Sequence, residues 1–237
     1  MSTATPAPAP ATRGGSRRGA ARRQAMLDAA CELFLEHGFE GASVADVVRR
    51  SGGSLATLYA SFGSKEGLFE AIVAQISAAM VAPFDAPDFE SRPLAEGLRV
   101  FGENLLGTMM CPDALRWQRM CVAEGPQFPA LRSALVRSGP GQVRERLAAY
   151  LAAQARAGRL RVADPLIAAR HFVALLKSET HLAALCGEPV ETSAADLAPQ
   201  VRRAVQVFLH GYGVEPRAPR RGRTAGPPPV STRAPRR

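Results

Sequence analysis

The fold is decided by residues 43–69, SVADVVRRSGGSLATLYASFGSKEGLF. This stretch has the pattern of two short amphipathic helices joined by a turn at Gly52 and Gly53, where a residue with a Cβ would be strained. Ser43 is the predicted N-cap of the first helix and Ser54 that of the second. The pattern predicts a helix-turn-helix, in which the second helix is short enough to enter a DNA major groove.

The second helix and the one after it supply the candidate DNA contacts. Leu58 and Phe62 are four residues apart and are expected to pack the second helix against the first. A third helix is predicted to begin at Ser64, with Lys65 beside backbone N–H groups that attract a phosphate. The same pattern in isolation also fits an ordinary capped hairpin. The predicted DNA-binding residues are Ser43, Ser54, Leu55, Ala56, Thr57, Tyr59, Ser61 and Lys65.

Together with the upstream segment RRQAMLDAACELFLEHGFEGASV, this stretch resembles the N-terminal DNA-binding domain of the TetR/AcrR family of bacterial transcriptional regulators. The resemblance covers about residues 22–70. The sequence departs from the family pattern at Gly53, Leu55 and Ser61. The matching positions include Ala29, Ala30, Leu33, Phe34, Gly38, Phe39, Ser43, Val44, Gly52, Ser54, Thr57, Leu58, Tyr59, Phe62, Ser64, Lys65, Glu66 and Leu68.

The net charge of +9 over 237 residues comes from the two ends of the chain. Residues 1–23 hold five arginines and no acid, and residues 214–237 hold seven arginines against Glu215. The segment between them has 18 basic and 20 acidic residues, so the DNA interpretation rests on the motif. We predict disordered tails over 1–21 and 214–237, which lack apolar periodicity. The first tail is either a DNA-following arm or only a solubilising segment.

The cysteines and the hydropathy pattern restrict the remaining function classes. Cys31, Cys111, Cys121 and Cys186 lack metal-site spacing, so no metal site is expected, and redox sensing by Cys111 and Cys121 is an alternative. The sequence predicts no apolar segment of about 20 residues and no secretory signal. We therefore expect a cytoplasmic protein without a membrane partner.

Everything after the helix-turn-helix also has helical periodicity. The helix that begins at Ser64 continues to Pro83, and strand alternation is absent. The sequence thus predicts an all-α fold, with a three-helix DNA-binding domain over 22–70 and a helical effector-binding and dimerisation domain over 71–213. The further helices are predicted over 94–110, 113–123, 128–138, 141–157, 164–186 and 195–211.

Two segments, RWQRMCVAEGPQFPAL at 116–131 and DPLIAARHFVALL at 164–176, resemble the ligand-sensing domain of the AefR-like branch of the family. In the family the last two long helices pack against their copies, which implies a homodimer through 164–186 and 195–211. Two recognition helices related by a twofold axis would read a near-palindromic operator. The predicted interface residues are Ile167, His171, Ala174, Leu182, Val201, Val205 and Phe208.

An effector pocket is expected among helices 94–110, 113–123, 141–157 and 164–186, lined by aromatic and thioether side chains. The predicted lining residues, each of which would also serve as ordinary core, are Phe101, Met109, Met110, Trp117, Met120, Phe172 and Leu176. We predict a repressor that a small apolar effector releases from DNA. The alternatives are an effector-independent or redox-responsive DNA-binding regulator. An enzyme is disfavoured because no nucleophile elbow, phosphate loop or metal cluster is found, and no cofactor is expected.

Overall fold

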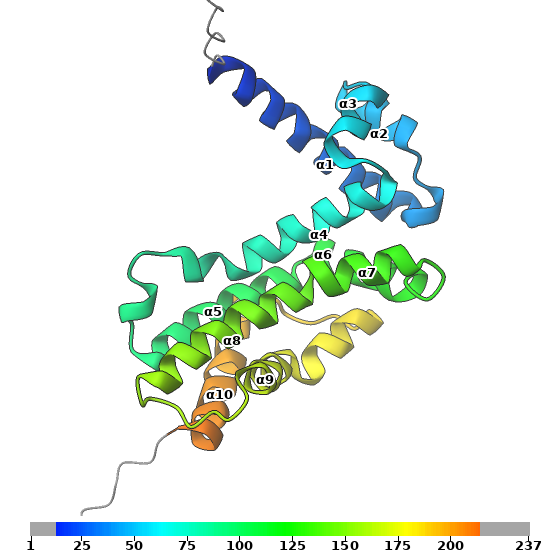
Figure 1. Ribbon diagram of the computed structural model, residues 1–237. Coiled ribbons are helices and arrows are strands. Elements are labelled where there is room, and N and C mark those ends of the chain that lie inside the picture. Colours follow the sequence, from blue (N-terminus) through cyan, green and yellow to red (C-terminus); the bar gives the residue numbers. More distant parts are fainter. Residues whose placement is uncertain (1–12, 214–237) are drawn as a thin grey trace, which may run out of the picture.

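The computed structural model describes residues 13–213, which form helices and one isolated antiparallel bridge between Leu160 and Gly213. The predicted all-α fold is confirmed. Each helix predicted beyond residue 93 begins and ends within one residue of its expected bounds. Figure 1 shows α2 and α3 at one end of the molecule and α9 and α10 at the other. The helices are α1 (Arg13–Gly41), α2 (Val44–Ser51), α3 (Leu55–Phe62), α4 (Lys65–Val81), α5 (Leu94–Met110), α6 (Pro112–Glu124), α7 (Pro129–Ser138), α8 (Pro140–Arg156), α9 (Pro165–Cys186) and α10 (Ala194–Tyr212), with 3-10 turns η1 (Ala82–Asp85) and η2 (Phe89–Ser91).

Helix α1 begins earlier than the sequence analysis expected. It starts at Arg13, so the prediction of disorder over 1–21 is wrong for residues 13–21, which are helical. These residues hold three arginines and two alanines, which favour a helix, and three glycines, which do not, and they continue the amphipathic helix that follows them. The rest of that predicted tail, residues 1–12, and the predicted tail over 214–237 lie outside the described residues.

The first core lies among α1, α2, α3 and α4 but is completed by α6 and α7. Trp117 of α6 stacks on Phe69 of α4 with 5.0 Å between ring centroids and meets Phe34 of α1 edge-on at 6.2 Å. The helix-turn-helix is therefore attached through aromatic contacts to a helix of the second half of the chain. The large buried members of this core include Met26, Phe34, Phe39, Leu58, Leu68, Phe69 and Trp117.

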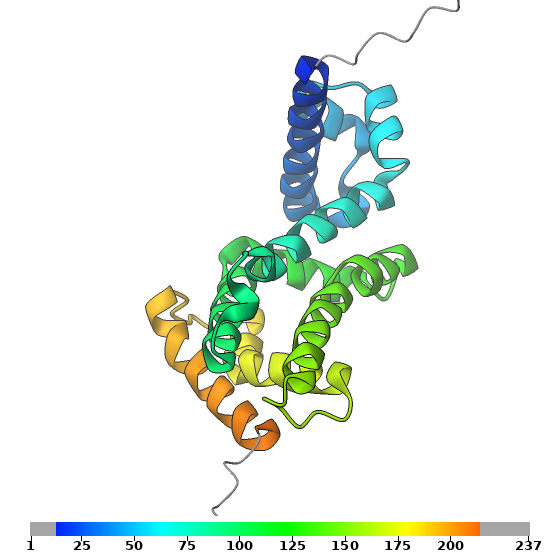
Figure 2. The same ribbon diagram turned by 60° about the vertical axis from the view of Figure 1, so that its left-hand side comes forward.

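The second core is formed by α5, α8, α9 and α10 together with η2. Its centre is aromatic: Phe172 of α9 and Phe208 of α10 have ring centroids 5.1 Å apart, and Phe101 of α5 is fully buried beside them. Burial of such large side chains is the main favourable contribution to packing of these long helices. Figure 2 shows α4 leading from the first core towards this second one.

Helix α4 explains an apolar segment that the sequence analysis did not expect. The segment Lys65–Asp85 is long and apolar enough to cross a membrane by length and composition, so the expectation that no such segment occurs is wrong. In the fold, Leu68 and Phe69 are buried in the first core, whereas Met80 and Val81 pack on the second. A helix that joins two cores needs apolar residues on more than one face, unlike a surface helix with a single stripe.

Helix α9 is interrupted within its length. Ser178 has φ 43° and ψ −163°, a left-handed backbone conformation that is uncommon outside glycine. The break leaves carbonyl oxygens without their helical partners, and Gln200 of α10 donates through Nε2 to the carbonyl oxygens of Leu176 and Lys177. The interruption is thus satisfied by the neighbouring helix, and it fixes the position of Lys177 at the end of the first segment.

Candidate DNA-binding surface and ligand cavity

The three short connections of the helix-turn-helix are held by serine caps. The side chains of Ser43, Ser54 and Ser64 accept the backbone N–H of the residue three positions later, over 3.1, 3.2 and 3.1 Å. Each cap satisfies a donor that an eight-residue helix such as α2 or α3 would otherwise leave unpaired. The predicted caps are therefore confirmed.

The glycine turn between α2 and α3 is confirmed as well. Gly52 ends α2 with φ 69°, which glycine adopts without steric cost. At Gly53 a Cβ would lie 2.3 Å from Cε of Met26, so the Met26 side chain fills the space that the apolar residue usual at this position in the family would need.

Helix α3 presents a short, largely uncharged surface to solvent. Leu58 is fully buried, while Leu55 and Tyr59 are 46% and 50% exposed. Both side chains are thus accessible to a partner that approaches this helix. Of the predicted DNA-binding residues, Ser43, Ser54, Leu55, Ala56, Tyr59 and Ser61 are exposed, and Thr57 and Lys65 are partly buried.

The arginines near this surface differ in whether a carboxylate pairs with them. Arg50 of α2 donates two hydrogen bonds of 2.9 Å to the Glu36 carboxylate of α1, and these bonds lower the pKa of that carboxyl. Arg23 stands over the Phe62 ring at 4.8 Å, at the edge of α3. The further exposed arginines of α1 are Arg17, Arg18 and Arg22. Of these arginines, Arg23 of α1 is the one in direct contact with α3.

Lys65 makes an internal contact that the sequence analysis did not foresee. Its Nζ donates to the backbone carbonyl oxygen of Glu40 over 3.0 Å and lies 4.6 Å from the centroid of the Phe39 ring. Burial at this place lowers the pKa of Lys65. The ammonium group therefore ties the start of α4 to the end of α1, and a phosphate contact from this side chain requires that hydrogen bond to be exchanged.

The carboxylate of Glu124, at the end of α6, binds the same corner of α1. It accepts the backbone N–H groups of Phe39 and Glu40, each over 3.1 Å. Gly38 precedes them with φ 76°, and a Cβ at this position would lie 2.3 Å from Glu124 Oε1. Glycine is thus required here both for the backbone conformation and for the approach of the carboxylate.

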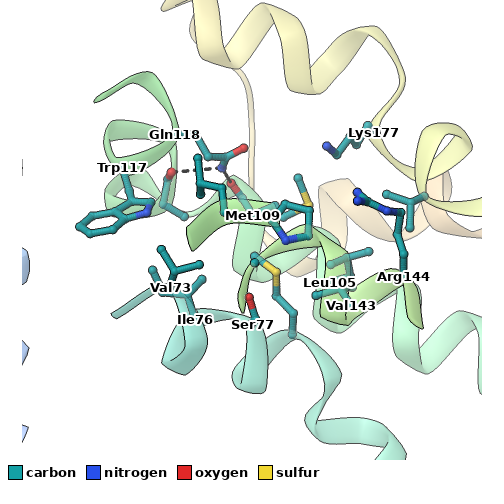
Figure 3. Close-up of a pocket in the computed structure, with 16 residues that line it drawn as sticks. Val73, Ile76, Ser77, Leu105, Met109, Trp117, Gln118, Val143, Arg144 and Lys177 are labelled. Carbon is teal, nitrogen blue, oxygen red and sulfur yellow. Dashed lines mark hydrogen bonds between the residues drawn. The ribbon is translucent and has the colours of Figure 1, made fainter. Parts of the chain in front are cut away.

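A partly open cavity of about 130 Å³ lies beside α4 and is also lined by α5, α6, α7, α8 and α9 (Figure 3). The polar groups at its wall belong to Ser77, Gln118, Arg144 and Lys177. Figure 3 shows Lys177 and Arg144 on one side of the space and Trp117 on the opposite side. The apolar lining consists of Val73, Ile76, Met80, Leu105, Met109, Ala114, Trp117, Leu135, Val143 and Val173, with Gly139 and Pro140.

Two of the predicted effector-binding residues, Met109 and Trp117, line this cavity. Phe101, Met110, Phe172 and Leu176 are buried in the second core, and Met120 packs on the first core, so these five do not line it. The four helices expected around the pocket all contribute. Sequence reasoning missed the contribution of α4 and the charged pair Lys177 and Arg144, although the presence of only two lysines in the chain was a readable signal for one of them.

The predicted interface residues fall into two groups. On α9, Ile167, His171, Ala174 and Leu182 are exposed, with Ile167 at 45% and Leu182 at 63%. On α10, Val201, Val205 and Phe208 are buried inside the same chain, so their assignment to an intersubunit surface is wrong. The large apolar side chain that α10 exposes is Val207, at 56%, and it lies with His171 and Ala174 around one shallow hollow.

The cysteines give little support to a redox-sensing site. Cys121 is buried in the first core, where burial and the charge of Glu124 raise its pKa to about 12. Because the thiolate is the reactive form, this thiol is held in its unreactive state. Cys111 is exposed at the start of α6.

The comparisons with known proteins match both halves of the chain. Residues 26–72 match the family model of bacterial regulatory proteins of the TetR family, and residues 96–214 match that of the C-terminal domain of AefR-like transcriptional repressors. Together with the exposed α3 and its capped supports, these matches show that the protein is a DNA-binding transcriptional regulator. Regulators of this family are not enzymes.

Individual relatives agree with these matches. The chain is 51% identical over 51 residues to the transcriptional repressor ComR of Escherichia coli K12, which is 22% of this chain and 24% of ComR. It is 27% identical over 194 residues to the regulator RutR of Escherichia coli K12, covering 82% and 83% of the two chains. Among solved structures, the flavonoid-responsive regulator FrrA superposes with a TM-score of 0.67 at 28% identity, over 82% of this chain and 98% of FrrA. The chain belongs to the TetR family of bacterial regulatory proteins, and its C-terminal half is of the AefR-like type.

Proposed function

We propose that this protein is a cytoplasmic homodimeric repressor whose affinity for a near-palindromic operator is lowered when a small molecule occupies the cavity beside α4. The observation that carries the proposal is the position of α6. Ala114 and Gln118 of this helix line the cavity, while Glu124 at its other end holds the backbone of Phe39 and Glu40. A ligand that displaces α6 acts on both places at once.

Trp117 strengthens this connection because one side chain touches both regions. Its ring lines the cavity and is stacked on Phe69 of the first core at 5.0 Å. Packed aromatic side chains transmit displacement because protein interiors are as dense as crystals of small molecules. A ligand can shift the operator equilibrium only as far as its affinities for the two arrangements differ, typically by about 1–3 kcal/mol.

The dimer is proposed to form through the exposed apolar residues of α9 and α10. Ile167, Leu182 and Val207 are each at least 45% exposed, and they lie on the two helices at the far end from α3. A symmetric contact would bury the same residues from both copies. It would also present two α3 helices to successive major grooves of an operator with twofold symmetry.

The relatives support a ligand response and repression without assigning either to this chain. FrrA is a flavonoid-responsive regulator, and ComR is a repressor. The principal competing function is an effector-independent DNA-binding regulator, in which the second half of the chain only dimerises. The cavity and its contact with the first core favour the ligand-responsive function over that one.

The test measures binding of the full-length protein to DNA that flanks its own coding region, by fluorescence anisotropy at several salt concentrations. Replacing Tyr59 with alanine should weaken binding to all sequences, and replacing Thr57 with alanine should change the preference among them. If both variants bound DNA with the affinity and the sequence preference of the wild type, the assignment of α3 as the recognition helix would be wrong.

The coupling is tested by filling the cavity. Ala114→Phe places a ring in the cavity, and the matched control Ala123→Phe places the same ring on the exposed side of α6. We expect the first variant to bind the operator about 5- to 150-fold more weakly, the range of typical allosteric coupling, and the control to bind as the wild type does. Equal operator affinity in two folded variants would support the effector-independent alternative.

A further inference from the structure

The cavity contains a pair of cationic side chains that the fold itself does not neutralise. Lys177 of α9 and Arg144 of α8 both line it, and among the described residues neither forms an ion pair with a carboxylate. The rest of the wall is predominantly apolar. Both side chains are partly buried, and a charge that is partly removed from water is stabilised by an opposite charge. The missing partner is the observation that needs an explanation.

The use of lysine at this place is not typical of the chain. Of its 30 lysine and arginine residues only two, Lys65 and Lys177, are lysines. Lys65 is partly buried and makes the specific contact with Glu40 described above. Lys177 is therefore not one of a population of interchangeable surface lysines. A compact ammonium on a long flexible stem differs from a guanidinium in both hydration and reach.

The backbone around Lys177 is fixed in a way that serves the cavity. The residue ends the first segment of α9, and Ser178 follows with φ 43°. Gln200 of α10 donates to the Lys177 carbonyl oxygen over 3.3 Å. Backbone conformations of this uncommon kind cluster at ligand sites, where the surrounding structure holds them in place.

The electrostatics of the site favour an added negative charge. Burial and the positive charge of Arg144 both lower the pKa of Lys177, and burial together with the charge of Lys177 lowers the pKa of His181. An anion beside Lys177 would raise the lowered pKa of this amine again, since an opposite charge a few ångströms away favours the protonated form. The guanidinium of Arg144 adds a planar donor pair that matches a carboxylate.

Gln118, another polar residue of the wall, leaves this role to the cationic pair. Gln118 donates through Nε2 to the carbonyl oxygens of Met109 and Ala114, over 2.9 and 3.1 Å. Its Oε1 lies 2.7 Å from Nε2 of His181. The amide is thus held by the protein at both of its polar atoms, and it shapes the wall instead of offering free donors to a ligand.

We propose that the cavity binds small amphipathic carboxylates, with the carboxylate between Lys177 and Arg144 and an apolar body directed towards Trp117. The cavity volume of about 130 Å³ suits one aromatic ring or a short alkyl chain. For comparison, an engineered apolar cavity of about 150 Å³ in another protein binds benzene. This inference rests on the proposed function for its biological meaning, because it names the chemical class of the effector.

The test uses phenylacetate and its neutral isostere phenylacetamide as probes, with acetate as an anion that lacks the ring. Trp117 is the single tryptophan of the chain and lines the cavity, so its fluorescence in the full-length protein reports binding directly. We expect phenylacetate to bind at least about tenfold more tightly than phenylacetamide, which corresponds to the attraction of one partly screened ion pair. Acetate should bind far more weakly than either.

Variants identify the groups responsible. Lys177→Met and Arg144→Met should each bring phenylacetate affinity closer to that of the amide while leaving amide affinity within about twofold. The control Arg156→Met removes an exposed charge from the same helix as Arg144 and should change neither affinity. Thermal melting of each variant confirms that it is folded.

The outcomes separate this inference from the proposed function. Equal affinity for the two probes, binding of neither, or unchanged phenylacetate binding in folded Lys177→Met and Arg144→Met would overturn the carboxylate site. Selective phenylacetate binding that is lost in those variants would support it. If such binding left operator affinity unchanged, the carboxylate site would stand and the proposed effector response would fail.

Discussion

The two halves of this protein hold their helices in place by different means. In the first half, α2 and α3 have eight residues each and are fixed by serine caps and a glycine turn. In the second half, helices of 17 to 22 residues such as α5 and α9 are fixed by the burial of one face. Local chemistry therefore positions the DNA-binding surface, whereas helical phase positions the cavity and the exposed face of α9 and α10.

The largest expected effect comes from breaking the place where the two halves meet. Phe69 is fully buried between Phe34, Phe39 and Trp117. Phe69→Ala should lower the free energy of unfolding by about 3–5 kcal/mol, because it removes a buried ring and leaves a cavity. Urea unfolding followed by Trp117 fluorescence and by circular dichroism measures the change.

Phe208→Ala in the second core provides the comparison for that variant. Phe208 packs on Phe172 with ring centroids 5.1 Å apart, away from the junction of the two cores. Phe208→Ala should lower the free energy of unfolding by a similar amount, but only Phe69→Ala should expose Trp117 to solvent in the native state. A loss of less than about 1 kcal/mol in Phe69→Ala would mean that the two halves are not joined through this cluster.

The second largest effect should follow from charging the exposed face of the second half. Leu182→Glu combined with Val207→Glu places like charges where the two copies are proposed to meet, and should convert the dimer to a monomer in sedimentation velocity. Operator affinity should then fall on the order of 100-fold, because the second half-site no longer adds its binding. The control Val122→Glu changes an exposed valine of α6, which is 71% exposed, and should leave the dimer intact.

A smaller effect is expected at the link between α6 and α1. Glu124→Ala removes a carboxylate that accepts the N–H groups of Phe39 and Glu40, and should cost about 1.5–3 kcal/mol for the loss of a charged acceptor, reduced by its partial exposure. Operator affinity with and without bound phenylacetate should become more similar in this variant. If phenylacetate still changed operator affinity by the wild-type factor, the Glu124 contact would not carry the response, and the packing of Trp117 would.

The smallest expected effect comes from removing one N-cap in each half of the chain. Ser54→Ala and Ser193→Ala each remove an N-cap, of α3 and α10 respectively, and should each cost about 1 kcal/mol of stability. Only Ser54→Ala should also weaken operator binding, because α3 is short and exposed. Equal operator affinity for both variants would show that packing, and not the cap, positions α3.

Much of the fold could be predicted from the sequence because its signals are local. The caps at Ser43 and Ser54 and the turn at Gly52 depend on residues a few positions apart, and all are found as expected. The ends of the long helices were also predictable, since Pro165 and Gly187 mark the two ends of α9. Such features need no knowledge of the tertiary structure.

The rest depended on which side of each helix faces the interior. Val201, Val205 and Phe208 form a stripe that fits either a core or an interface, and only the packing of α10 on α5 and α9 decides between them. The cavity likewise combines α4 with α8 and α9, whose relative placement no sequence spacing encodes. The break at Ser178 follows from tertiary contacts and has no glycine or proline to announce it.

Because the chain has only two lysines, an acylating reagent can modify just two side-chain amines. These two ε-amines lie at the start of α4 and in the wall of the cavity, and every other basic side chain except histidine is an arginine, which acylating reagents leave unmodified. The acylation rate of each lysine can be followed by peptide mass spectrometry in a single reaction. The rate at Lys177 would report on occupancy of the cavity, and the rate at Lys65 on the breaking of its hydrogen bond to Glu40.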